Sequence, residues 1–362
     1  MIGGYFESWL CQRCILIYLN KKKKVFVHTS HDGRRIATLD GHAQQITSLA
    51  WTMVQEEDGT VQSVLATASY DSNVKIWRPR DGPTWYCDQT FSQHTHAVTA
   101  VHFQQSVLPS SQTLLVASLD AEGDIRIWCA ATLTVKVALS IAGREFTGFT
   151  PCPLKFSPIS PYQTVAMAMG TQLVILSLDD SILQDSHSAV AKRASLPAPH
   201  EKSINTLDFS PDGQWLLLAS DEKITVWHTA TWQLVYTQTV RMDKISSSTF
   251  IGNDTLAWGE YQAMYLLDFQ AFVAHAGRVP SHYHHGQGRI DSSLEPNAPT
   301  PFENGQKMLT IPLAHPAGSL TGLSWVRPQH NANSSSSLIC SVSTDKYENV
   351  RVWQVNPLIA SS

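Results

Sequence analysis

The chain contains no run of 18 or more consecutive apolar residues, so we expect no membrane span. It also lacks an excess of positive charge, because 26 Lys and Arg residues stand against 30 Asp and Glu residues. The formal net charge of −4 gives no basic footprint for nucleic acid over the chain as a whole. Cysteine is scarce and scattered, with six residues among 362. This usage is typical of a cytoplasmic or nuclear protein with reduced, buried thiols.

Motifs for catalysis and cofactor binding are missing as well. The sequence holds no G-x-S-x-G, Walker-type or G-x-G-x-x-G pattern, and we therefore expect no enzyme activity, no cofactor and no small-molecule substrate. Cys11 and Cys14 have no second pair at zinc-ligand spacing, which favours two thiols at strand ends over a metal site. The histidines at 282, 284 and 285 are better explained as part of a solvated loop, so no metal site is expected.

The sequence does contain an internal repeat. Four segments share an apolar run, a turn with an aspartate and an alternating run that ends in tryptophan: residues 65–77, 115–128, 216–227 and 339–353. Two short β-type runs around a polar turn predict a β-hairpin. Three of the hairpins are preceded by a histidine and a further alternating run, at His42, His94 and His200.

This repeat resembles the WD-repeat family, whose units of about 40–45 residues carry Gly-His and Trp-Asp signatures and form propeller blades. The resemblance runs from about residue 25 to 355 and is clearest between Gly41-His42 and Trp77. It implies an all-β fold, a seven-bladed WD40-type β-propeller with four antiparallel strands in each blade and room for an incomplete first or last blade. It also implies a buried tetrad in which Trp donates to Ser, Ser to His and His to Asp.

The tetrad positions follow from the repeat. Such networks fix the register of a blade, because breaking them leaves buried polar groups without partners. The expected structural residues are His42, Ser69, Asp71 and Trp77 in the second blade, His94, Ser118, Asp120 and Trp128 in the third, His200, Asp221 and Trp227 in the fifth, where Ala219 replaces Ser, and Ser343, Asp345 and Trp353 in the last.

One domain over residues 1–362 accommodates all the blades. We expect them at about residues 5–42, 43–94, 95–144, 145–200, 201–241, 242–315 and 316–355. Insertions at 53–63, 104–112 and 327–336 fall between first and second strands. The stretch 270–306 is rich in Pro, Gly and Ser and is expected to be a mobile loop. Closure of the ring stays open, since residues 3–9 could supply a closing strand or part of the N-terminus could be missing.

The resemblance implies a non-catalytic scaffold or adaptor, a subunit of a multiprotein complex that binds other proteins through rim and loop surfaces. Its expected place is the cytoplasm, the nucleus or both, while its partner, pathway and oligomeric state are not indicated. By position on the rim, the candidate partner-binding residues are Gln44, Tyr70, His96, Arg144, Phe146, Lys202, Asp243 and Tyr261.

Two other functions stay open. A nucleic-acid-associated module, for RNA or chromatin, could start from the lysines at 21–24, although a solvated hairpin turn is the favoured interpretation of that run. The sequence Trp77-Arg78-Pro79-Arg80 is similar to the motif by which some WD-repeat proteins dock on cullin ubiquitin-ligase adaptors as substrate receptors. Arg80 fits that motif, whereas Arg78 stands where the motif has Asp or Asn.

Overall fold

The fold is given by a computed structural model of the full chain. It describes residues 8–10, 15–20, 23–29, 34–80, 84–104, 113–141, 152–158, 163–178, 192–240, 245–260, 263–269, 308–311, 320–326, 337–343 and 350–355. Within this part, the strands form antiparallel sheets, each built from strands that follow one another in the chain. In the described part of the chain, no helix has the length and apolar character needed to cross a membrane.

The first three sheets use the N-terminal strands. The first sheet contains β1 (Ser8–Leu10), β2 (Ile15–Asn20), β3 (Lys24–Thr29) and β4 (Arg35–Asp40). The second contains β5 (Ile46–Gln55), β6 (Val61–Ser69), β7 (Val74–Pro79) and β8 (Trp85–Phe91). The third contains β9 (Val98–Phe103), β10 (Leu115–Asp120), β11 (Asp124–Cys129) and β12 (Val135–Ser140).

The remaining strands form four more sheets. The fourth contains β13 (Leu154–Phe156), β14 (Gln163–Met169), β15 (Gln172–Leu178) and β16 (Lys192–Pro197). The fifth contains β17 (Ile204–Phe209), β18 (Trp215–Ser220), β19 (Lys223–His228) and β20 (Gln233–Thr239). The sixth contains β21 (Ile245–Ile251), β22 (Thr255–Glu260), β23 (Ala263–Asp268) and β24 (Met308–Ile311). The seventh contains three described strands, β25 (Leu320–Val326), β26 (Ser337–Ser343) and β27 (Val350–Val355).

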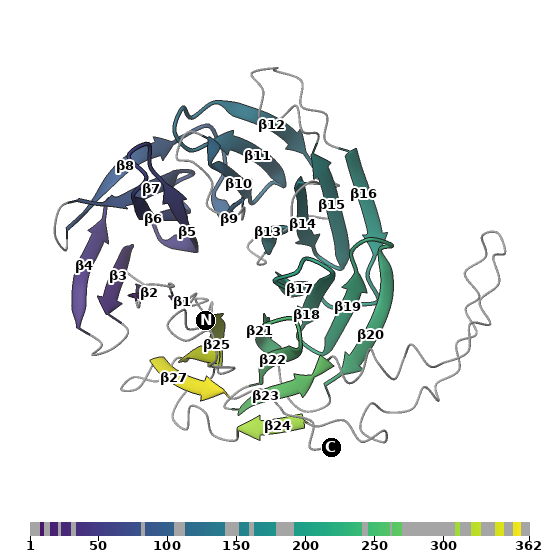
Figure 1. Ribbon diagram of the computed structural model, residues 1–362. Coiled ribbons are helices and arrows are strands. Elements are labelled where there is room, and N and C mark those ends of the chain that lie inside the picture. The colour runs from purple at the N-terminus through teal and green to yellow at the C-terminus, as the bar shows by residue number, and fades with distance from the viewer. Residues whose placement is uncertain are drawn as a thin grey trace.

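The sheets stand around a common axis, with the first strand of each sheet innermost and the last outermost (Figure 1). Apolar side chains fill the space between neighbouring sheets. Phe91 of the second sheet, for example, packs with Phe103 and Trp128 of the third. Further clusters join each following pair of sheets in the same way, as well as the first sheet to the second. Inner and middle strands are therefore apolar on both faces, and the chain is an all-β propeller.

A bulge marks the beginning of the innermost strand in five sheets. The pairing skips one residue there, and that residue is always small and polar: Thr47, Thr99, Asn205, Ser246 and Thr321. In two of these sheets the hydroxyl donates to a carbonyl of the adjacent strand, from Thr99 to Leu119 and from Ser246 to Gly259. The side chain thus supplies a hydrogen bond where the ladder is interrupted.

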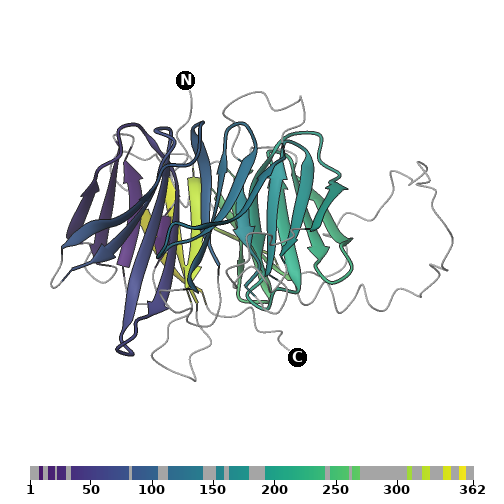
Figure 2. The ribbon, with the colours of Figure 1, turned by 90° about the horizontal axis from the view of Figure 1, so that it is seen from above.

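The structure decides one open question, about Ser8 and Trp9, and contradicts one expectation, about residues 53–63. Ser8 and Trp9 belong to β1 and pair with β2, so they complete the first sheet instead of closing the last. Most of 53–63 is strand and not an insertion, because β5 and β6 stay paired as far as Gln55 and Val61, and only 56–60 form the turn. The reason is apolar burial, since Val54 and Val64 are both fully buried. Figure 2 shows this long hairpin, in dark blue, extending past its neighbours. Residues 105–112, 270–306 and 327–336 lie outside the described part.

Candidate interaction surface

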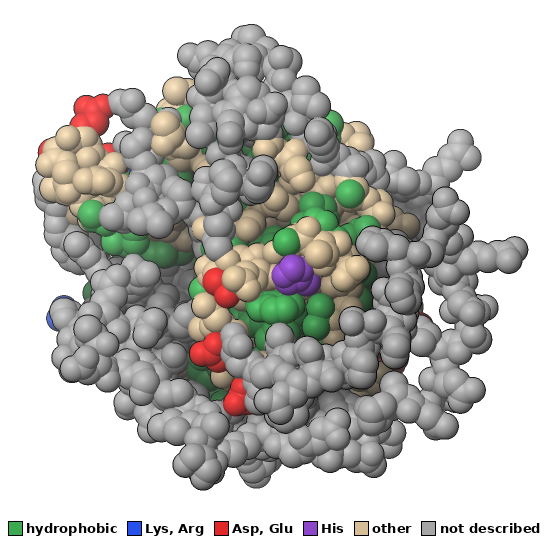
Figure 3. All heavy atoms as spheres, turned by 45° about the vertical axis from the view of Figure 1, so that its right-hand side comes forward, with side chains coloured by type: hydrophobic (Ala, Val, Ile, Leu, Met, Phe, Trp, Pro, Cys, Tyr) green, Lys and Arg blue, Asp and Glu red, His purple; other side chains and the backbone are tan. Residues whose placement is uncertain are grey.

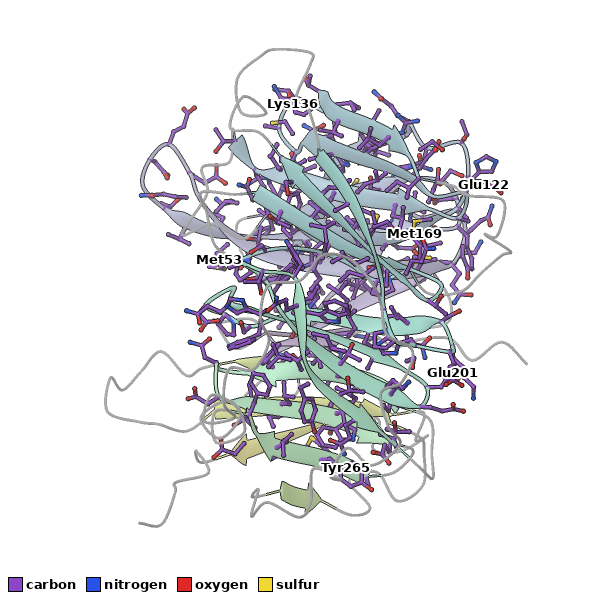
Figure 4. The ribbon with its side chains drawn as sticks, turned by 90° about the vertical axis from the view of Figure 1, so that its right-hand side faces the viewer. Met53, Glu122, Lys136, Met169, Glu201 and Tyr265 are labelled. Atoms are coloured by element: carbon purple, nitrogen blue, oxygen red, sulfur yellow. The ribbon has the colours of Figure 1, made fainter. Side chains whose placement is uncertain are left out.

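The turns between second and third strands, at residues 70–73, 121–123 and 221–222, lie at one face of the propeller, which we call the turn face. The chain also enters the innermost strands from this face. Figure 4 shows Glu122 and Glu201 at the turn face and Met53, from the long hairpin, toward the opposite one. The expected structural and partner-binding residues can be located relative to this face.

In the second sheet, a buried chain of hydrogen bonds joins the turn to the third strand. The indole N–H of Trp77 donates to Thr67 Oγ1 at 2.9 Å, and Thr67 Oγ1 lies 2.7 Å from His42 Nε2. His42 Nδ1 lies 2.9 Å from Asp71 Oδ2. Burial lowers the pKa of His42, partly offset by Asp71, so the ring is neutral near pH 7. Nδ1–H therefore donates to Asp71 and Nε2 accepts from Thr67.

The hydroxyl in this chain was expected from Ser69, and the structure has Thr67 in that place. Trp77 pairs with Leu65, so Thr67 is two residues further along the strand and Ser69 is four. At about 3.3 Å per residue, Ser69 lies roughly 13 Å along the strand from that pair, beyond reach of the indole. Ser69 Oγ donates instead to Gln44 O at 3.3 Å and accepts from the N–H of Asp71 at 3.2 Å.

The third sheet joins the four residues that the repeat indicates. Trp128 Nε1–H donates to Ser118 Oγ at 3.2 Å, Ser118 Oγ lies 2.7 Å from His94 Nε2, and His94 Nδ1 lies 3.1 Å from Asp120 Oδ2. Burial alone would raise the pKa of Asp120, but the hydrogen bonds from His94 and from backbone N–H groups lower it overall. Phe91 stacks on Trp128 with ring centres 4.4 Å apart, which fixes the indole between two sheets.

The fifth sheet uses a different set of partners. His200 Nδ1 lies 2.9 Å from Ser220 Oγ, and His200 Nε2 lies 2.9 Å from Thr225 Oγ1, which also accepts from Trp227 Nε1 at 3.3 Å. The hydroxyl comes from the third strand because Leu218, which pairs with Thr225, occupies the place of Thr67 and Ser118.

The expected pairing of His200 with Asp221 was wrong. Ser220 occupies the Nδ1 position, and Asp221 accepts a hydrogen bond from the amide of Asn205. Because burial dominates and no carboxylate bonds the ring, the pKa of His200 falls to about 4. The shorter turn of this sheet, 221–222, accounts for the changed position of the aspartate.

We call each of these buried chains of side-chain hydrogen bonds a brace. The sixth sheet contains a brace that the repeat did not indicate. Trp258 lies on the second strand, not the third, and its Nε1–H donates to Glu260 Oε1 at 2.6 Å. Tyr265 stacks on the indole at 5.4 Å. The sequence signal is a tryptophan two residues before a glutamate at a strand end. In the seventh sheet, Ser343 lies on β26 and Trp353 on β27, and Asp345 lies outside the described residues.

These braces have the residue types of a hydrolase triad, but their geometry serves packing. The hydroxyl groups of Thr67 and Ser118 belong to fully buried residues and each accepts from an indole N–H. A substrate therefore has no path to them. No group of three His, Cys, Asp or Glu side chains suited to a metal occurs in the described ranges.

The described candidate partner-binding residues lie at the turn face, in the second, third and fifth sheets. Gln44, His96 and Lys202 each follow a brace histidine by two residues, and all three are exposed. Tyr70 is partly buried in the turn of the second sheet, and Lys202 forms an ion pair with Glu222. The other four candidates lie outside the described residues: Arg144, Phe146, Asp243 and Tyr261.

Three of the basic residues that suggested other functions have partners within the chain, and Lys21 and Lys22 lie outside the described residues. Arg78 donates to Asp88 at 2.9 Å and to Glu56 at 2.5 Å. Lys23 donates to the carbonyl of Ala43, and Lys24 pairs with Asp40 at 2.6 Å. The face seen in Figure 3 carries acidic side chains and little basic surface among the coloured residues. Cys11 and Cys14 lie outside the described part.

Comparison with known proteins agrees with these braces and sheets. The family model "WD domain, G-beta repeat" matches residues 33–78, 85–129 and 193–228. Each matched stretch contains a brace histidine and its tryptophan, namely His42 and Trp77, His94 and Trp128, and His200 and Trp227.

Curated relatives are similar at low identity. The Arabidopsis thaliana transcriptional corepressor LEUNIG_HOMOLOG is 24% identical over 67% of this chain and 27% of its own length. The Arabidopsis thaliana pre-mRNA-processing factor 19 homolog 2 is 26% identical over 54% of this chain and 32% of its own. Elongator complex protein 2 of Mus musculus is 25% identical over 59% of this chain and 24% of its own.

The chain therefore spans about a quarter to a third of the length of these relatives. The matched repeats, the braces and the ring of sheets agree: the chain carries WD repeats at residues 33–78, 85–129 and 193–228 and resembles the WD-repeat family as a divergent case.

Proposed function

We propose that the chain is a non-catalytic scaffold that binds other proteins through the turn face, as a subunit of a larger complex inside the cell. The observation that carries the proposal is that each brace combines a buried histidine with an exposed residue close to it in the sequence. His42, His94 and His200 are buried and hydrogen-bonded, whereas the residue two positions later in each sheet is exposed at the same face. The brace thus presents Gln44, His96 and Lys202 from rigid backbone, which limits the entropy lost on binding.

Two further points support the proposal. A transcriptional corepressor, a pre-mRNA-processing factor and an Elongator complex protein are among the similar proteins, and the name of the last one assigns that protein to a complex. Cys87 is a free cysteine, as expected in a reducing compartment. We also propose that each sheet is one blade, which makes a ring of seven in a single domain.

The experiment compares the two faces in cells. Gln44→Arg, His96→Arg and Lys202→Glu alter the turn face. As a control, Gln214→Arg places a positive charge, like the first two, in an exposed turn between the first two strands of the fifth sheet. We expect the tagged native chain and the Gln214 variant to elute in a large complex, and the turn-face variants to elute as the free chain. Equal elution of all variants with unchanged folding, or loss only with Gln214→Arg, would refute the turn face as the binding site.

Competing functions give different results in the same experiment. A nucleic-acid-bound chain would leave its complex on nuclease treatment and at raised salt. A substrate receptor of a cullin-type ligase would lose its adaptor with Arg78→Ala or Arg80→Ala, not with turn-face variants. The ion pairs of Arg78 with Asp88 and Glu56 favour a structural role for that residue instead.

A further inference from the structure

We propose that Arg126 anchors a site for a carboxylate group, which an aspartate or glutamate side chain of the protein partner supplies. The inference rests on the proposed function, because it names the chemistry of a partner that binds at the turn face. Its basis is a partly buried cation of the third sheet that has no acceptor in the described part of the chain and lies beside an exposed stretch of the turn face.

The cation lies in the middle of β11, the third strand of the third sheet. Arg126 is partly buried, and its Nε atom is enclosed by protein but has no hydrogen-bond partner among the described residues. Within the same ranges, Arg126 also takes part in no ion pair. A buried donor without an acceptor is costly, and buried polar groups are paired as a rule. The guanidinium is therefore set up for an acceptor that another molecule brings.

The second sheet shows how the chain satisfies a cation at the equivalent position. Lys75 occupies that position, because Lys75 and Arg126 each pair with the hydroxyl residue of their own brace. Lys75 Nζ donates to Thr90 Oγ1, on the outermost strand, at 3.0 Å. In the third sheet, Ala138 pairs with Arg126 from the outermost strand and has no side-chain acceptor. Ala138 is also exposed, so its small side chain leaves this side of the guanidinium open.

An exposed stretch of the turn face passes close to the same side of the sheet. Phe91 stacks on the brace tryptophan, which lies two residues after Arg126 and therefore on the same face of β11. His94 is hydrogen-bonded to the brace hydroxyl that lies opposite Arg126. Residues 92–93 connect these two fixed points, and both are exposed. A partner side chain that reaches Arg126 from the turn face can therefore also bond to the polar side chains of 92–93.

The surrounding charges favour a carboxylate over a phosphate. The turn after β10 carries Asp120, Glu122 and Asp124, and Figure 4 shows Glu122 at the turn face. A carboxylate brings one negative charge, which Arg126 neutralises, and its planar shape matches the guanidinium fork. A phosphate group carries about −1.5 to −2 charges near pH 7, which would leave an excess of negative charge beside the three acidic residues.

NMR of arginine Nε–H groups tests the site in the native chain, labelled with nitrogen-15 in its arginines. Sodium acetate is the probe, with sodium chloride and inorganic phosphate compared at matched ionic strength, and Arg126→Lys identifies the signal. We expect the Arg126 signal to shift to saturation with acetate, at a concentration at least about threefold lower than with either other salt. No saturating shift, as for an Nε atom bonded to water alone, or tighter binding of phosphate would overturn the proposal.

A photo-crosslinking amino acid at Gln93 tests the source of the carboxylate in cells. We expect an adduct whose crosslinked partner segment contains aspartate or glutamate. Arg126→Gln should lower the yield of this adduct by about tenfold, because a charged hydrogen bond is lost. Lys75→Gln removes the cation at the equivalent position of the second sheet and should leave the yield unchanged. An unchanged yield with Arg126→Gln, or an equal loss with Lys75→Gln, would overturn the proposal.

The two experiments together separate this inference from the proposed function. Adducts at the turn face that do not depend on Arg126, combined with no saturating acetate shift, would overturn the carboxylate site and leave the turn face as the binding surface. A saturating acetate shift without any adduct at the turn face would support the carboxylate site. It would also refute the proposed function, and with it the partner protein as the source of the carboxylate.

Discussion

Replacing the hydroxyl of Thr67 by a methyl group tests the brace of the second sheet most sharply. Thr67→Val keeps the shape and volume of the side chain, so it creates almost no cavity. It removes the acceptor of the Trp77 indole and the donor to His42 Nε2. Both of these groups are buried in a fully packed region, since Trp77 and His42 are 3% and 5% exposed.

The magnitude follows from the two groups left without partners. An unsatisfied buried donor or acceptor costs about 1–3 kcal/mol, so the variant should lose roughly 2–4 kcal/mol of unfolding free energy. Ser69→Ala, two residues away on the same strand, removes only two long contacts to backbone groups and should cost about 0.5–1 kcal/mol. Thr67→Ser retains the hydroxyl and should recover most of the loss.

Urea unfolding followed by tryptophan fluorescence measures the three variants on one scale. The midpoint should fall clearly for Thr67→Val, slightly for Ser69→Ala and little for Thr67→Ser. Equal midpoints for Thr67→Val and the native chain, or a larger fall for Ser69→Ala, would refute the assignment of the hydroxyl.

Three further predictions concern the same interior. Trp77→Ala should cost about 3–5 kcal/mol in urea unfolding, by cavity formation and loss of the brace; a loss below about 1 kcal/mol would contradict its burial. Gly41→Ala should lower the melting temperature modestly, because the added Cβ would lie 3.2 Å from Cη2 of Trp77, and an unchanged melt would show that the indole can move aside. The free energy of unfolding should fall by a few kcal/mol as pH drops from about 6.5 to 4. The folded-state pKa values of His200 and His102, about 4 and about 3, lie below the unfolded value near 6.5. Only the unfolded chain therefore takes up protons on these residues in this pH range. That contribution is fully present above pH 6.5, and a His200→Gln variant with an unchanged pH slope would contradict the assignment for that residue.

The sequence predicted the repeat well where hydrophobic alternation and a fixed tryptophan coincide. It could not decide between Thr67 and Ser69, because residues two apart on a strand share a face and only the pairing with the tryptophan strand separates them. Trp258 was missed because it lies on the second strand of its sheet, whereas the repeat has its tryptophan on the third strand. These choices depend on register, which a single sequence leaves unspecified.

Short or altered elements account for the other differences. β1 has three residues, too few for a periodic pattern, so the first sheet could not be counted as four-stranded in advance. In the fifth sheet, Leu218 lies where the second and third sheets have a hydroxyl side chain. Thr225, which pairs with Leu218 on the neighbouring strand, supplies the hydroxyl group instead. Asp221 pairs with Asn205 because the turn of this sheet is shorter. The shorter turn is visible in the sequence, but the new partner of Asp221 could not be predicted from it.

The central proposal is that a protein partner binds the turn face. A photo-crosslinking amino acid placed at His96, and separately at Gln214 as the control position, tests it directly in cells. We expect a discrete protein adduct from position 96 and none from position 214, with the adduct lost in the Lys202→Glu background. Adducts of equal yield from both positions, or an adduct at 214 alone, would contradict it.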